Sequence, residues 1–152
     1  MLRIGHRGAR AYEPENTLRS FQKALELGVN GIEFDVRKTK DSKLVVIHDV
    51  DVKRTTNGKG LVADLTLDEI KVLRTEKSEK IPTLEEALSL IDNKAKILIE
   101  LKEQNLEQDV LNTVCAKKLE NNVIITSFLE DTLKKTRELN PQIETGFSLI
   151  IH

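Results

Sequence analysis

The chain has 152 residues, of which 39% are hydrophobic and 32% charged, with 24 basic side chains against 25 acidic ones. This balance is typical of one soluble globular domain and excludes a collagen, a low-complexity disordered chain and a disulfide scaffold. The formal net charge of −1 provides no sequence-wide basic field, so we expect neither nucleic acid nor an anionic membrane surface as a partner. Any anion that the chain binds must be held by local charges.

The single cysteine and the N-terminus bear on the cellular compartment. Cys115 has no second thiol to pair with and lies in a helical pattern, where we expect a small buried hydrophobic residue. The N-terminus has no apolar signal region, and no apolar run approaches the roughly 18 residues that span a bilayer. The sequence therefore predicts a cytoplasmic protein without a transmembrane segment.

Short apolar runs alternate along the chain with longer amphipathic stretches, which is typical of an α/β protein. We expect strands at 2–6 and 31–36, with a helix at 16–27 between them that ends before Gly28. The next apolar run, 44–48, follows after too few residues for a crossover helix. Spacing alone therefore predicts a hairpin between 31–36 and 44–48.

The rest of the chain continues the alternation after a polar, turn-rich stretch at 51–65. Thr66 and Thr83 each stand three residues before a glutamate, and these capping boxes predict the starts of two helices, the second ending near residue 91. The remaining expected elements are strands at 97–101, 123–127 and 144–151 and helices at 105–119 and 129–139, which gives six strands in all. Functional groups of α/β proteins gather at the carboxyl ends of strands, so these ends are the positions to inspect.

The first strand ends in an imidazole and a guanidinium, His6 and Arg7, between the glycines Gly5 and Gly8. Arginine binds phosphate oxygens bidentately, histidine transfers a proton near neutral pH, and glycine lets the backbone approach a ligand closely. The pattern suits a phosphate site. The alternative is a surface loop with two exposed polar side chains.

Carboxylates mark two further strands. Alternation places Glu33 and Asp35 on one face of the strand 31–36, where burying both is costly without a cation or a strong partner. Glu100 would add a third carboxylate, and Lys102, on the same face, could meet a phosphate oxygen. Hard oxygen ligands suit Mg²⁺ or Ca²⁺. The alternative is the polar outer face of a sheet that is covered on one side only.

The run 44–48 ends in His48, and Asp49 either fixes the tautomer of this imidazole or caps the turn that follows. The strand ends together supply two histidines, three carboxylates, an arginine and a lysine. This set of side chains is typical of a metal-assisted phosphoryl-transfer site.

Several blocks of the sequence also resemble, in order, the motifs of the glycerophosphodiester phosphodiesterase family. The resemblance runs from residue 3 to about residue 148, and the number of ordered blocks makes it specific. The blocks are His6-Arg7-Gly8, Glu15-Asn16-Thr17, Ile32 to Val36, Thr39-Lys40-Asp41, Val46 to Asp49, Arg54 to Gly58, Ile81 to Leu84, Ile99 to Lys102 and the pair Ser127-Phe128.

The resemblance implies a fold, which is a TIM (β/α)8 barrel of the phospholipase C-like phosphodiesterase type with its site at the carboxyl ends of the strands. It implies that 44–48 is a barrel strand rather than half of a hairpin. It also implies one domain over 1–152, with a small insertion at about 51–80 over the site. Because six predicted strands are fewer than the eight of a closed barrel, we expect an incomplete barrel that lacks the last two strands. Self-association would cover the open sheet edges.

The resemblance also implies an activity, which is metal-dependent hydrolysis of glycerophosphodiesters to glycerol 3-phosphate and an alcohol. It assigns one divalent cation, Mg²⁺ or Ca²⁺, and a small-molecule substrate. The implied roles are acid and base for His6 and His48, phosphate binding for Arg7 and Lys102, and cation binding for Glu33, Asp35 and Glu100.

The residues leave other interpretations open. Asn16 is expected first as the N-cap of the helix 16–27, with a lesser case for Glu15 as a substrate contact. A chain without the last strands could be an inactive, cation-binding fragment or pseudoenzyme. A related phospholipase D-type lipid phosphodiesterase is a further alternative, against which the polar stretch 51–65 and the lack of paired cysteines argue.

Overall fold

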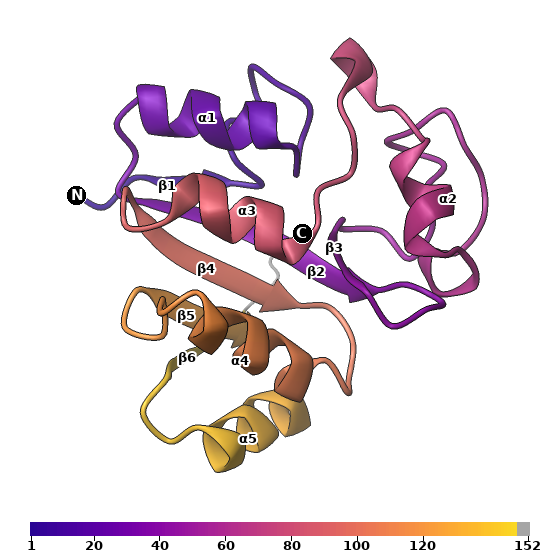
Figure 1. Cartoon of the computed structure of the whole chain (residues 1–152). Helices are drawn as coiled ribbons and strands as arrows, with labels where there is room; N and C mark the ends of the chain where they lie inside the picture. The colour runs from indigo at the N-terminus through magenta and orange to yellow at the C-terminus, as the bar shows by residue number, and fades with distance from the viewer. Residues whose placement is uncertain (149–152) are drawn as a thin grey trace.

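The computed structural model describes residues 1–148 and contains an open, mostly parallel sheet (Figure 1). Five parallel strands pair in a single order: β1 (Ile4–His6), β2 (Gly31–Lys38), β4 (Lys96–Leu101), β5 (Val123–Ser127) and β6 (Glu144–Phe147). In this part of the chain β1 and β6 do not pair with each other, so the sheet is a partial barrel that is not closed. The end of the predicted last strand and His152 lie outside the described residues.

The sixth strand, β3 (Leu44–Val46), runs antiparallel to β2, with Val46 opposite Val36 and Leu44 opposite Lys38. The expectation that 44–48 is a barrel strand is therefore wrong, and the hairpin that spacing predicts is confirmed. The reason is the length of the connection, since residues 39–43 are too few for the crossover that joins parallel strands. The tip of this hairpin extends beyond the carboxyl ends of the parallel strands and returns the chain to the site at His48.

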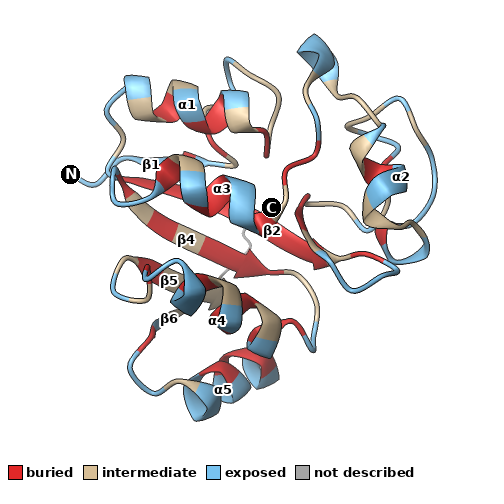
Figure 2. Ribbon diagram, viewed as in Figure 1, coloured by how far each residue is buried: buried red, intermediate tan, exposed pale blue. Residues whose placement is uncertain are grey.

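Four helices cover one face of the sheet: α1 (Leu18–Glu26), α3 (Leu84–Ile91), α4 (Glu107–Ala116) and α5 (Glu130–Leu139) (Figure 1). Their apolar sides and the outward strand residues form the main core, in which Phe21 and Phe34 stack with ring centres 5.5 Å apart. Figure 2 shows that β2 and β4 are buried along most of their length. Because side chains alternate along a strand, burial of Ile32 and Phe34 against the helices turns their neighbours to the inner face.

The predicted helices and strands are confirmed, with shifts at their ends. Thr66 and Thr83 form capping boxes before α2 (Leu67–Lys71) and α3, as expected. Helix α1, however, begins after Thr17, whose hydroxyl accepts a hydrogen bond from the amide of Ser20. Asn16 is not the N-cap, because its φ of 54° is left-handed and its side chain is used elsewhere.

Cys115 is exposed, so the expectation that it is buried is wrong. On α4 the inward positions are taken by Leu111 and Val114, both buried against the core. Cys115 follows Val114 by one residue and so points away from the sheet.

Residues 51–80 form, with β3, a small core that is separate from the main core under the four covering helices (Figure 1). The segment contains α2 and two 3₁₀ turns, Val62–Asp64 and Glu76–Ser78. Its apolar residues pack among themselves, against the hairpin and against Ile81. The buried residues of this small core are Val45, Ile47, Val52, Val62, Ile70 and Ile81. The segment therefore has apolar support of its own and is fastened to the strand that leads to His48. No helix within residues 1–148 is long and apolar enough to cross a bilayer.

Candidate active site

The strand register brings four of the predicted site residues, His6, Glu33, Asp35 and Glu100, into one row across the inner face of the sheet. His6 is the direct neighbour of Glu33 on β2, and Asp35 is the direct neighbour of Glu100 on β4. Thr126 on β5 stands next to Glu100. Side chains at matched positions of neighbouring strands point to the same face. The row therefore joins four strands, β1, β2, β4 and β5, near their carboxyl ends.

Glu33 and His6 form the first part of this row. The Oε2 atom of Glu33 accepts a hydrogen bond from the backbone amide of Arg7 at 3.2 Å and lies 3.6 Å from Nε2 of His6. Burial, together with the nearby charges of Asp35 and Glu100, raises the pKa of Glu33 to about 8. Partial burial and then Arg10 and Arg7 lower the pKa of His6. Without a cation, Glu33 thus holds a proton at neutral pH, while His6 is neutral.

Asp35 lies deeper, and two polar side chains contact it. Its Oδ2 accepts a hydrogen bond from Nδ2 of Asn16 at 3.0 Å and lies 3.6 Å from Nε of Arg7. Arg7 also donates to Oε1 of Glu15 at 3.2 Å, so its guanidinium is held between two carboxylates. Sequence reasoning gave Asn16 a capping role only. Its tolerance of the left-handed backbone, which few other residues share, is the signal that was available.

Glu100 and Lys102 form the third part of the site. Oε2 of Glu100 accepts a hydrogen bond from the Thr126 hydroxyl, whereas the buried Oε1 has no hydrogen-bond partner. Burial raises the pKa of Glu100, and Lys102 opposes this shift. The Lys102 ammonium lies 5.3 Å from the centre of the Phe128 ring. Within residues 1–148 it forms no ion pair, which leaves it available to an anion.

His48 stands at the return of the hairpin, two residues after the end of β3. Its Nδ1 lies 2.8 Å from Oδ1 of Asp49, a contact that favours the neutral tautomer with the proton on Nδ1 and the lone pair on Nε2. Its carbonyl accepts a hydrogen bond from Nε of the buried Arg37 at 2.9 Å. Arg37 also pairs with Glu103 at 3.3 Å and so ties the hairpin to the chain after β4. Of the two roles considered for Asp49, the structure shows the contact with the imidazole.

Arg54 is a second residue that sequence reasoning did not single out. It lies within 51–80 and donates hydrogen bonds to both Asp49 and Glu15. These hydrogen bonds from Arg54, with a smaller contribution from His48, hold the pKa of Asp49 well below its usual range. Only its place in the block Arg54 to Gly58 marked it in the sequence, because no local pattern reveals a contact with Glu15.

The three carboxylates of the row fit an oxygen-bound divalent cation in donor type and charge. Within residues 1–148, no three His, Cys, Asp or Glu side chains are arranged to hold a metal ion as they stand. Yet Asp35 and Glu100 are buried and Glu33 is partly buried on one face, and desolvation raises the pKa of Glu33 and Glu100. Two buried oxygens, Oε1 of Glu100 and Oδ1 of Asn16, also lack hydrogen-bond partners among residues 1–148. A cation would satisfy both deficits.

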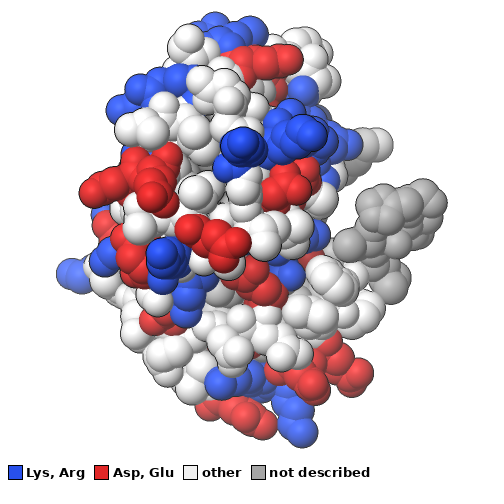
Figure 3. Space-filling model, turned by 90° about the vertical axis from the view of Figure 1, so that its right-hand side faces the viewer, with Lys and Arg blue, Asp and Glu red and all other residues white. Residues whose placement is uncertain are grey.

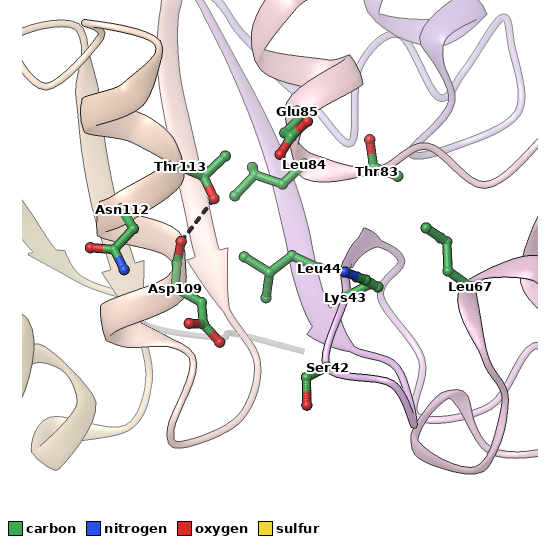
Figure 4. Close-up of a pocket in the computed structure, with 10 residues that line it drawn as sticks. All are labelled: Ser42, Lys43, Leu44, Leu67, Thr83, Leu84, Glu85, Asp109, Asn112 and Thr113. Atoms are coloured by element: carbon green, nitrogen blue, oxygen red, sulfur yellow. Dashed lines mark hydrogen bonds between the residues drawn. The ribbon is translucent and has the colours of Figure 1, made fainter.

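Two larger cavities lie outside the row. One, of about 380 Å³, adjoins the site and is lined by Arg10, Ala11, Glu13, Pro14, Glu15, Arg54, Thr55, Thr75 and Glu76. The other, of about 410 Å³, lies between the tip of the hairpin and the helices α3 and α4 (Figure 4). Its lining contains none of the predicted site residues. We therefore place the site at the strand ends and not in the larger cavity.

The surface around the segment 51–80 carries no field of a single sign. Figure 3 shows basic and acidic side chains interspersed on this side of the molecule. The charges that act on a bound anion are therefore the local ones of the site.

A parallel α/β sheet shaped as part of a barrel, with acidic, basic and imidazole groups at its carboxyl ends, defines an α/β-barrel protein with a polar site in the usual position for that fold. Comparison with known proteins agrees with this class. The profile of the Glycerophosphoryl diester phosphodiesterase family matches residues 6–150. The chain belongs to this family.

Relatives and solved structures place the chain more closely. It is 42% identical over 158 aligned positions to a glycerophosphodiester phosphodiesterase of Caldanaerobacter subterraneus subsp. tengcongensis, covering 95% of this chain and 65% of that relative. A crystal structure of glycerophosphodiester phosphodiesterase from Agrobacterium tumefaciens superposes with a TM-score of 0.89 at 31% identity, covering 95% of this chain and 66% of the other. A phosphodiesterase of Oleispira antarctica, solved with the product sn-glycerol-3-phosphate, gives 0.87 at 31% identity, covering 98% and 66%. The chain thus spans slightly under two thirds of the length of each of these three proteins.

Proposed function

We propose that this chain hydrolyses glycerophosphodiesters to glycerol 3-phosphate and an alcohol, with one divalent cation, Mg²⁺ or Ca²⁺. The observation that carries the proposal is the register that sets His6 beside Glu33 and Asp35 beside Glu100 on one face. Family membership supports the reaction class. The product bound to the Oleispira relative supports a glycerol phosphate as the ligand.

The basic side chains are proposed to hold the phosphodiester. Among the described residues, the Lys102 ammonium forms no ion pair and the buried Nε of Arg7 makes no hydrogen bond. Both would neutralise phosphate oxygens, Arg7 by turning part of its guanidinium from Asp35 toward the anion. Bound at Glu33, Asp35 and Glu100, a divalent cation would supply further positive charge for the developing phosphoryl charge.

The two histidines are proposed to move the protons. One imidazole takes the proton of the glycerol hydroxyl next to the phosphate, the hydroxyl oxygen bonds to phosphorus, and the bond to the alcohol oxygen breaks as the other imidazolium protonates that oxygen. Water then opens the cyclic phosphate while the two histidines exchange roles. His6 suits the base of the first step, because its lowered pKa leaves it neutral, and His48 would then be the acid and exchange its proton at Nε2, because Asp49 holds Nδ1.

Substitutions at the carboxylates test the cation site by a readout other than activity. Titration calorimetry with Mg²⁺ or Ca²⁺ should detect binding to the wild-type chain and none to Glu33→Ala or Glu100→Ala. The folded state of these variants should be retained, because removing one carboxylate relieves repulsion in the cation-free protein. Cation binding that survives both substitutions would contradict the assignment.

Substitutions at the histidines test the proton transfers. His6→Ala and His48→Ala should each lower the rate of hydrolysis by roughly 10² or more while cation binding is kept. A near wild-type rate in either variant would reassign that histidine to a structural role. A wild-type chain that binds the cation and releases no product would favour the inactive, cation-binding interpretation.

A further inference from the structure

Arg54 joins two parts of the site that are distant in the sequence. It makes four hydrogen bonds to two carboxylates. Toward Asp49, Nε donates to Oδ2 at 2.8 Å and Nη2 to Oδ1 at 3.0 Å. Toward Glu15, Nη1 donates to Oε2 at 3.2 Å and Nη2 to Oε1 at 2.7 Å. The planar guanidinium therefore uses two of its edges, each in the bidentate geometry that fixes a carboxylate in orientation as well as position.

Each of these carboxylates also contacts a residue that we place in the reaction. Oδ1 of Asp49 lies 2.8 Å from Nδ1 of His48, and Oε1 of Glu15 accepts a hydrogen bond from Arg7 at 3.2 Å. The contacts thus form a continuous chain from the imidazole of His48 through Arg54 to the guanidinium of Arg7. The three linking residues come from different parts of the fold: Glu15 from the loop before α1, Asp49 from the return of the hairpin, and Arg54 from the segment 51–80.

The position of Asp49 depends mainly on Arg54. Within residues 1–148 its carboxylate has three polar side-chain contacts, of which Arg54 supplies two and His48 the third. Glu15, in contrast, keeps Arg7 when Arg54 is removed. The half-exposed Arg54 adds little stability as an ion pair, since such pairs are weak in water. Its effect is on geometry, because Asp49 without Arg54 is free to leave the imidazole.

We propose that Arg54 is a positioning residue, which clamps Asp49 against His48 and so holds this imidazole with its proton on Nδ1 and its lone pair on Nε2. The effect of Arg54 on kcat rests on the proposed function, whereas its effect on the tautomer of His48 does not. It also gives the segment 51–80 a role in catalysis, because the small core of that segment carries Arg54 to its place.

Nitrogen-15 NMR of the full chain tests the structural part. The chain has three histidines, and ring spectra near neutral pH distinguish the two tautomers of each neutral imidazole. The His48 ring should be mainly the Nδ1–H tautomer in the wild type and shift toward the Nε2–H tautomer in Arg54→Ala. Lys53→Ala removes the neighbouring exposed charge, which makes no hydrogen bond through its side chain within residues 1–148, and should leave the His48 ring unchanged. An unchanged tautomer in Arg54→Ala would overturn the proposal.

Kinetics of the same variants test the catalytic part. Arg54→Ala should lower kcat by roughly 10- to 100-fold, the range for loss of a group that orients a functional histidine, with KM changed much less. Guanidinium ion at non-denaturing concentration should restore part of the rate in Arg54→Ala. Arg54→Lys keeps the charge but not the bidentate geometry, so its kcat should stay below that of the wild type. An effect on KM alone would overturn the positioning role, and so would a rate of Arg54→Ala that guanidinium ion does not raise. If the wild type itself releases no product, the proposed function fails, and the tautomer still decides whether Arg54 positions His48.

Discussion

At this site, burial and neighbouring carboxylates determine the pKa of individual acidic residues. Glu33 stands beside Asp35 and Glu100 in a region with little water, and its pKa rises to about 8. The folded chain therefore holds the Glu33 proton more tightly than the unfolded chain does. The stability that follows is complete below the ordinary pKa of about 4.5 and is lost as the pH rises through about 8.

This sign gives a prediction for the cation-free protein. Glu33→Gln removes the titration but keeps an acceptor for the amide of Arg7, so its stability should fall less than that of the wild type between pH 5 and pH 8. At pH 8 the variant should melt roughly 2–4 °C higher, the shift that 1 kcal/mol produces in a domain of this size. Thermal unfolding in EDTA measures this difference, with the exposed Glu85→Gln as control. If the melting temperatures of Glu33→Gln and the wild type changed equally with pH, the raised pKa of Glu33 would be contradicted.

At the level of elements, local patterns predicted more than long-range contacts did. Three local patterns each determine their structure, and each prediction is confirmed. They are the capping boxes at Thr66 and Thr83, the two-residue alternation at Glu33 and Asp35, and the short connection before 44–48. The resemblance to the family, applied to 44–48, gave the wrong strand direction.

Other parts of the site could not be predicted because they depend on residues far apart in the sequence. Asn16 contacts Asp35, and Arg54 contacts Glu15 across 39 positions. No periodicity carries such pairings, and only the folded chain reveals them. The exposure of Cys115 likewise depends on which face of α4 meets the sheet.

The segment 51–80 should behave as a unit that loosens apart from the sheet. Ile70 is fully buried in its small core, and Ile70→Ala should cost about 2–5 kcal/mol within that unit. Hydrogen exchange should lose protection in 51–80 and β3 while β4 stays protected. Val72→Ala on the same stretch is a matched control, because Val72 is 70% exposed. Equal loss of protection in β4 would show that segment and sheet unfold together.

Over the whole molecule, the described sheet has one covered face and two open edges. The outer face packs on the helices, whereas the inner residues Leu98 and Ile124 are partly exposed, and β1 and β6 each pair on one side only within residues 1–148. Phe147 on β6 is 58% exposed. Unpaired edges with exposed apolar groups promote association.

We therefore expect the 152-residue chain to self-associate through these edges. Sedimentation velocity should give a mass above 17.2 kDa that rises with concentration. Phe147→Lys should weaken this association, and Leu139→Lys, which changes an exposed residue in the last turn of α5, should not. A mass of 17.2 kDa at every concentration would contradict self-association.

The strand-end residues of this chain are proposed to form a cation-dependent phosphodiesterase site. The most direct test is phosphorus-31 NMR of glycerophosphocholine with the wild-type chain of 152 residues, first in EDTA and then with excess Mg²⁺ or Ca²⁺. We predict that the signal of glycerol 3-phosphate grows only after the cation is added and stops when EDTA is restored. Unchanged substrate in the presence of a folded chain with bound cation would contradict the claim.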